Sequence, residues 1–105
     1  MTLTREFRAT LQERAQHDTA FRQAMLRESV EALLSGDTET GRAMLRDYIN
    51  AAVGFGELAE ATKIPAKSLM RMFGPEGNPR ANNLFNVIHH LQTREGVHFG
   101  VIAHN

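Results

Sequence analysis

The sequence contains no cysteine, no tryptophan and only one tyrosine. Because cysteine is absent, disulfides and thiolate metal sites are excluded, and a reducing compartment is compatible with the composition. No apolar run approaches the roughly 18 residues that a membrane-spanning helix needs, and the N-terminal "MTLTREFRATLQERAQ" lacks the apolar core of a signal peptide. We therefore expect a cytoplasmic protein with no membrane partner.

The chain also lacks net charge, since 12 Lys and Arg residues balance 12 Asp and Glu residues. A neutral chain is not attracted as a whole to nucleic acid, so the distribution of its charges is more informative than their sum. Residues 31–50 carry four acidic side chains against two arginines. Residues 63–80 carry only Glu76 against four bases, which are Lys63, Lys67, Arg71 and Arg80. Basic charge is therefore concentrated in one short segment.

Apolar residues recur at helical spacing along most of the chain, beginning with the stripe of Leu3, Phe7 and Leu11. Cap and stop residues divide this pattern into two N-terminal helices, a third helix, two short helices within residues 57–79 and a last helix. These caps and stops are, in order, Asp18, Gly36, Asp37 or Thr38, Gly54 and Gly96. A length of 105 residues suffices for one modest core, so we expect a single all-α domain of about five to six helices.

In the C-terminal "VHFGVIAHN" the spacing of apolar residues changes from a helical period to a period of two. Val97, Phe99, Val101 and Ala103 alternate with His98, Gly100, Ile102 and His104, which is typical of a short β-strand with one apolar face. Because a single strand has no ladder partner, we expect it to pair with the same strand of a second subunit. The sequence thus predicts a homodimer held by Val97, Phe99 and Val101, or alternatively by the N-terminal apolar stripe.

Residues 57–79, "ELAEATKIPAKSLMRMFGPEGNP", have the pattern of a helix-turn-helix. Such a motif needs a small residue where the helices cross, a turn of about three or four residues and an apolar inner face on the second helix. Ala59 supplies the small contact, Ile64 fills the turn, and Leu69 and Met72 face the core. Pro65 suits the first turn of the second helix, where its missing N–H costs nothing. We divide the domain into N-terminal helices (1–35), a helix-turn-helix core (37–95) and a C-terminal strand (96–105).

The second helix of this pair presents basic side chains on its outer face. Lys67 and Arg71 lie one turn apart, as two side chains entering a major groove together would. We therefore predict binding to double-stranded DNA through Lys63, Ala66, Lys67, Ser68, Met70 and Arg71. Short paired helices also occur in proteins that never bind DNA, and the turn position that is commonly glycine is Lys63 here. A helical interaction module without DNA binding is the alternative.

Residues 33–91 also resemble the antidote proteins of addiction modules, within the lambda-repressor-like helix-turn-helix regulators. The most specific parts are "SGD", "ELAEATKIPAKSLMRMF", "GPEGNPR" and the strand-like "GVHFGV". The resemblance implies a dimeric transcriptional repressor of its own operon, and an antitoxin role in which the chain also binds a small toxin protein. It places Ala66, Lys67, Ser68, Met70 and Arg71 on the recognition helix. It places Asn78 and Arg80 at the start of the next helix, where phosphate contacts are made.

The sequence gives little support for a metal site, a phosphate-binding loop or a catalytic site. His89 and His90 are adjacent on a helix and point in different directions, whereas His98 and His104 are about 20 Å apart in an extended strand. The "GPEGNP" segment lacks the Lys-Ser/Thr ending of a phosphate loop and is typical of a turn in which Asn78 caps the next helix. No combination of nucleophile, base and orienting acid is present. We expect no metal, no cofactor and no enzymatic activity.

Overall fold

The computed structural model describes residues 4–104, which form six α-helices and one π-helical turn. No described residue lies in a β-strand, and no helix in this part of the chain is long and apolar enough to cross a bilayer. The all-helical prediction is therefore confirmed. The elements are α1 (Arg5–His17), α2 (Thr19–Leu34), α3 (Thr38–Tyr48), η1 (Ile49–Val53), α4 (Phe55–Thr62), α5 (Ala66–Met72) and α6 (Ala81–Glu95).

The helix boundaries follow from side-chain caps that the sequence already indicated. The Phe21 N–H donates to Asp18 Oδ1 at 2.9 Å, and the Thr40 N–H donates to Asp37 Oδ1 at 3.2 Å. Each bond satisfies an amide in the first turn that has no partner within its own helix. Gly54 has φ of 90°, which side chains disfavour, so it separates η1 from α4 as predicted.

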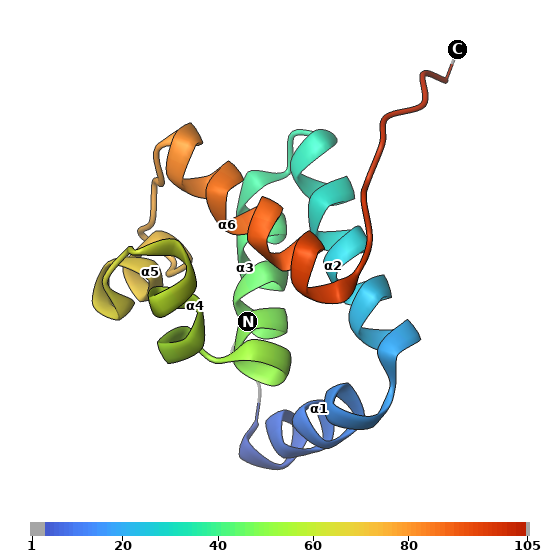
Figure 1. The fold of residues 1–105 in the computed structure, drawn as a ribbon, viewed down its shortest axis with the longest axis vertical. Helices are drawn as coiled ribbons and strands as arrows, with labels where there is room; N and C mark the ends of the chain where they lie inside the picture. The colour runs from blue at the N-terminus through green and yellow to red at the C-terminus, as the bar shows by residue number, and fades with distance from the viewer. Residues whose placement is uncertain (1–3, 105) are drawn as a thin grey trace.

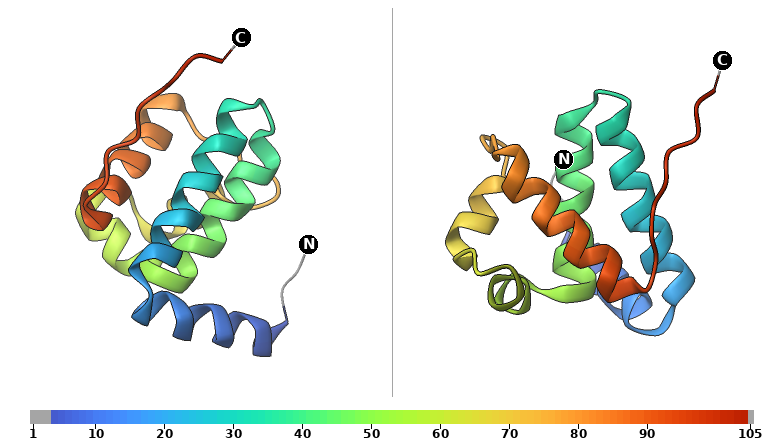
Figure 2. Two further views of the ribbon diagram at one scale, coloured as in Figure 1. Left: turned by 90° about the vertical axis from the view of Figure 1, so that its right-hand side faces the viewer. Right: turned by 45° about the horizontal axis from the view of Figure 1, so that its top comes forward.

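The helices pack around one core, with α2 and α3 side by side and antiparallel (Figures 1 and 2). The α1 helix crosses the base of this pair, and α6 runs diagonally across it, while α4 and α5 lie beyond α3. Every helix from α2 to α6 contributes buried apolar side chains. The core cluster consists of Leu26, Leu45, Tyr48, Ile49, Phe55, Leu58, Leu69, Met72, Phe73, Val87, Ile88 and Leu91.

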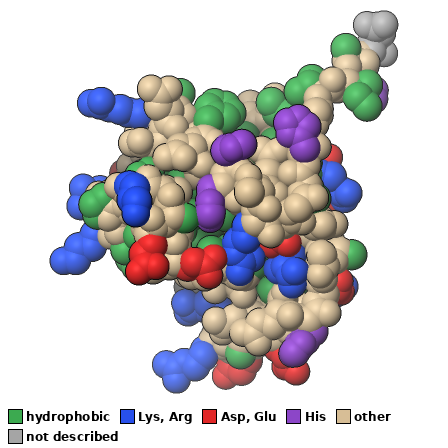
Figure 3. Space-filling view, in the orientation of Figure 1, with side chains coloured by type: hydrophobic (Ala, Val, Ile, Leu, Met, Phe, Trp, Pro, Cys, Tyr) green, Lys and Arg blue, Asp and Glu red, His purple; other side chains and the backbone are tan. Residues whose placement is uncertain are grey.

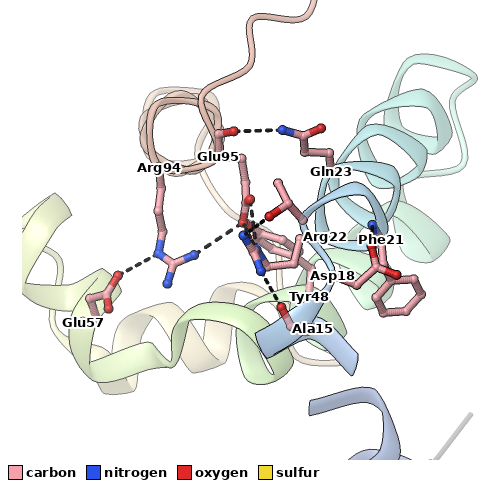
Figure 4. A network of polar contacts seen from close by, with 10 residues as sticks. Ala15, Asp18, Phe21, Arg22, Gln23, Tyr48, Glu57, Arg94 and Glu95 are labelled. Carbon is pink, nitrogen blue, oxygen red and sulfur yellow. Dashed lines mark hydrogen bonds and ion pairs between the residues drawn. The ribbon is translucent and has the colours of Figure 1, made fainter. Parts of the chain in front are cut away.

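A buried carboxylate joins three of these helices through charged hydrogen bonds (Figure 4). The side chain of Glu95, at the end of α6, is only 1% exposed. Arg22 Nε of α2 donates to both of its oxygens, at 3.1 and 3.2 Å. The Tyr48 hydroxyl of α3 donates to Oε2 at 2.5 Å, and Arg94 Nη1 donates to the same oxygen at 3.4 Å. Burial of this charge is tolerable because it is paired and hydrogen-bonded.

Both arginines of this network also bind neighbouring elements. Arg22 Nη1 donates to the carbonyl of Ala15 in α1 at 2.6 Å. Arg94 Nε donates to Glu57 Oε2 in α4 at 2.9 Å. The network therefore connects α1 to α4.

The predicted C-terminal strand is absent from the described part of the chain. Residues 97–104 are extended without a ladder, and the tail leaves the body of the protein (Figure 1). Val97 and Phe99 pack against the core, and the Phe99 N–H donates to Gln92 Oε1 at 2.8 Å. Val101 and Ile102 are 82% and 79% exposed. A strand requires a second extended segment beside it, and no other described segment of the chain supplies one.

Candidate nucleic-acid interface

The α4–α5 pair has the short connection that the sequence predicted. The α4 helix ends at Thr62 and α5 begins at Ala66, so three residues form the turn. Leu58 is fully buried, and Ala59 and Ile64 are partly buried against the core. Pro65 precedes α5 as its N-cap residue, one position earlier than predicted.

Lys63 adopts the left-handed conformation in this turn, with φ of 63° and ψ of 23°. Its N–H donates to the carbonyl of Ala59 at 2.9 Å, which ends α4. A left-handed residue after a helix is usually glycine, because a Cβ atom crowds the following carbonyl. The lysine therefore adopts the left-handed conformation at the position where the motif commonly has glycine.

The α5 helix buries one face and exposes the other. Leu69 is fully buried and Met72 is 9% exposed, as the spacing predicted. On the opposite face Lys67 and Arg71 are exposed, and Met70 is 52% exposed. Ala66 and Ser68 are half-buried, so Ala66 is less accessible than Lys67, Met70 and Arg71, with which it was predicted to face outward.

The loop from α5 to α6 packs tightly against the end of α5. A Cβ atom at Gly77 would clash with the carbonyl oxygen of Met72 and would lie 2.6 Å from that of Arg71. Arg42 Nη1 of α3 donates to the carbonyl of Gly74 at 3.0 Å. The Arg42 hydrogen bond ties the loop to α3, and the missing side chain of Gly77 permits the close approach of the loop to the end of α5.

The start of α6 differs from the prediction that Asn78 would cap it. The helix begins at Ala81, Arg80 is its N-cap residue, and no side chain caps its free amides. Asn78 is two residues too early to do so, because Pro79 and Arg80 continue in an extended path. Arg80 itself lies at the helix start, as predicted.

A surface groove of about 520 Å³ lies between α5, the loop and the start of α6. It brings together five of the predicted binding residues, which are Lys63, Ser68, Arg71, Asn78 and Arg80. Asn83, in the first turn of α6, also lines it and was missed, although it lies three residues after Arg80 and hence on the same side of the helix. The other predicted residues, Ala66, Lys67 and Met70, do not line the groove.

The charge of this region is unbalanced. Glu76 is the only acidic residue that lines the groove, against three basic ones. Lys63, Lys67, Arg71 and Arg80 form no ion pair with another described residue, and neither do Arg5, Arg8, Arg42 and Arg46, which are more widely spread along the chain. Basic side chains project from the molecule over α5 and the loop before α6 (Figure 3). An anionic partner would therefore meet unpaired cations here.

The described residues contain no group of three or more His, Asp or Glu side chains that could hold a metal ion. Comparison of the chain with protein-family models, with curated proteins and with solved structures gives no match.

Proposed function

We propose that this chain is a sequence-specific DNA-binding transcriptional regulator that represses its own operon, with α4 and α5 as a helix-turn-helix. The observation that carries the proposal is the set of four basic side chains around α5, none of them paired with an acid of the described chain. Phosphate neutralisation by Lys and Arg supplies a large share of the affinity in such complexes. In this proposal the chain acts in the cytoplasm, and its function involves no catalysis and no cofactor.

Arg71 and Arg80 take different roles in this proposal. Arg71 is exposed on the outer face of α5, and its planar fork can donate two parallel bonds to the O6 and N7 atoms of one guanine. Arg80 is exposed at the uncapped start of α6, where free amides and the helix dipole favour a phosphate. Asn78 and Asn83 border the same groove, and their side-chain amides can donate hydrogen bonds to phosphates of the DNA backbone.

The test compares two arginine variants on an operator fragment and on scrambled DNA at several salt concentrations. Arg71→Ala should lose roughly 1–3 kcal/mol of discrimination at one base position per half-site. Arg80→Ala should weaken binding to all sequences alike and lower the salt slope by about one unit. Arg27→Ala is the matched control, because it removes one exposed positive charge from α2.

Enriched fragments from a genomic pull-down would supply the operator for these titrations. The proposal fails if Arg71→Ala leaves the ratio of specific to scrambled affinity unchanged. Binding that neither saturates nor depends on sequence would instead favour the alternative, an interaction module in which the helix pair serves packing only. The narrower antitoxin role stays a prediction from the family resemblance.

We further propose that the regulator is a homodimer, so that two α5 helices meet half-sites about 34 Å apart. The extended tail supports this, because its backbone beyond Gly100 has no ladder partner among the described residues and Val101 is exposed. Val97 and Phe99 pack on their own core, so their contribution to pairing would be indirect. The alternative interface is the stripe on α1, where Phe7 is 51% exposed; Leu3 lies outside the described residues.

A further inference from the structure

A second hollow, of about 230 Å³, lies on the N-terminal side of the molecule, between α1, α2 and α3. Its apolar wall includes Phe7 of α1, Phe21 and Met25 of α2, and Met44 of α3. Phe7 is 51% exposed, so the wall faces solvent. The hollow shares no lining residue with the basic groove beside α5, so the two are separate surfaces.

The charged residues that line this hollow are both acidic. They are Glu28 of α2 and Asp47 of α3, and neither forms an ion pair or a side-chain hydrogen bond with another described residue. Arg8 borders an adjacent hollow together with Asp47, yet no ion pair joins them. Asp47 is half-buried, and burial raises the pKa of its carboxyl group more than the nearby charges of Arg46 and Arg8 lower it. The other buried carboxylate, Glu95, is by contrast bound by three side-chain donors.

The size and chemistry of the hollow favour a peptide over a small molecule. Its volume is below the range of about 300–1,000 Å³ that is usual for small-molecule sites. It can accept one large apolar side chain, which is how an amphipathic helix anchors in a groove. The two unpaired carboxylates complement a basic residue one turn away from that anchor.

We propose that this hollow docks an amphipathic helix of a partner protein, which inserts one large apolar side chain and places a Lys or Arg against Asp47 and Glu28. The apolar anchor supplies the affinity. The cation fixes the register of the helix and selects basic partners over acidic ones.

The probe is a displayed library of helical peptides, selected on the full-length protein. Selected peptides should share a large apolar residue with a basic residue three or four positions away. Phe7→Ala should weaken the best of them about tenfold. Phe85→Ala is the matched control, because Phe85 is 63% exposed on α6 and is not part of the hollow. Asp47→Lys should reverse the selection toward acidic peptides.

Several outcomes would overturn the proposal. These are the absence of any enriched peptide, enrichment without a basic residue, and equal binding by the Phe7→Ala and Phe85→Ala proteins. A solution mass that falls in Phe7→Ala alone would show that a second copy occupies the hollow, which also contradicts a partner helix. Thermal unfolding by circular dichroism establishes that each variant is folded, and Asp47→Lys gives a change of preference that mere loss of structure cannot produce.

Discussion

Replacing Tyr48 by phenylalanine removes one hydroxyl from the buried network and leaves the aromatic ring in the core. Tyr48 is fully buried, and its hydroxyl donates to Glu95 at 2.5 Å. A hydrogen bond to a charged group contributes about 1.5–3 kcal/mol, and Glu95 keeps its bonds from Arg22 and Arg94. We therefore expect Tyr48→Phe to lower the free energy of unfolding by about 2 kcal/mol near neutral pH.

The same bond predicts a distinct pH dependence. Burial, and then the hydrogen bond and negative charge of Glu95, raise the pKa of Tyr48 above its ordinary value of 10.0. A raised pKa means that the folded state favours the protonated hydroxyl. The contribution of this hydroxyl to the stability of the folded protein is therefore complete below pH 10 and is lost as the pH rises above 10. For one proton the loss is about 1.4 kcal/mol per pH unit. The difference between wild type and Tyr48→Phe should therefore shrink above pH 10.

Urea unfolding, followed by circular dichroism at a series of alkaline pH values, measures this difference. Because Tyr48 is the only tyrosine and the chain has no tryptophan, the ultraviolet absorbance of tyrosinate reports its ionisation directly. Arg27→Ala is a control, since it breaks an exposed ion pair of 3.8 Å and should cost about 0–0.5 kcal/mol. The reasoning is refuted if Tyr48 ionises near pH 10 in the folded protein, or if the difference between wild type and Tyr48→Phe does not change with pH.

Three further predictions concern glycine positions, the turn and the tail. Gly41→Ala should destabilise the protein by about 1–3 kcal/mol, because the new Cβ atom would lie 2.6 Å from Leu33 Cδ2. Gly56→Ala should stabilise the protein by about 0.5–1 kcal/mol, because a Cβ atom there would have no other atom within 4 Å and alanine favours a helix. Denaturant midpoints test this pair, and equal shifts would contradict it. Lys63→Gly should raise the free energy of unfolding by about 1 kcal/mol, because glycine adopts the left-handed conformation of Lys63 without strain. The same change should weaken DNA binding, because it removes a positive charge. A lower free energy of unfolding would mean that the turn is not strained. Truncation after Gly100 should convert the proposed dimer to monomer by sedimentation, because it removes the exposed Val101 and Ile102; an unchanged mass would exclude the tail as the interface.

The sequence by itself determined several helix boundaries and the buried face of α5. Asp18 was identified as a cap, Asp37 as one of two candidate caps and Gly54 as a stop, because these signals act within a few residues of the chain. The inner positions of α5, Leu69 and Met72, were identified for the same reason, since helical spacing alone decides which side chains share a face.

Only the tertiary structure decided which distant residues meet. Arg71 and Asn83 line one groove because the intervening loop folds back onto α5, with Gly77 against its last carbonyls. Tyr48 and Glu95 are 47 residues apart, and no local pattern pairs them. The tail has the alternating pattern of a β-strand, but its described residues form no strand. The pattern only gives the segment an apolar face, whereas a strand also needs a neighbouring chain segment that exchanges hydrogen bonds with it.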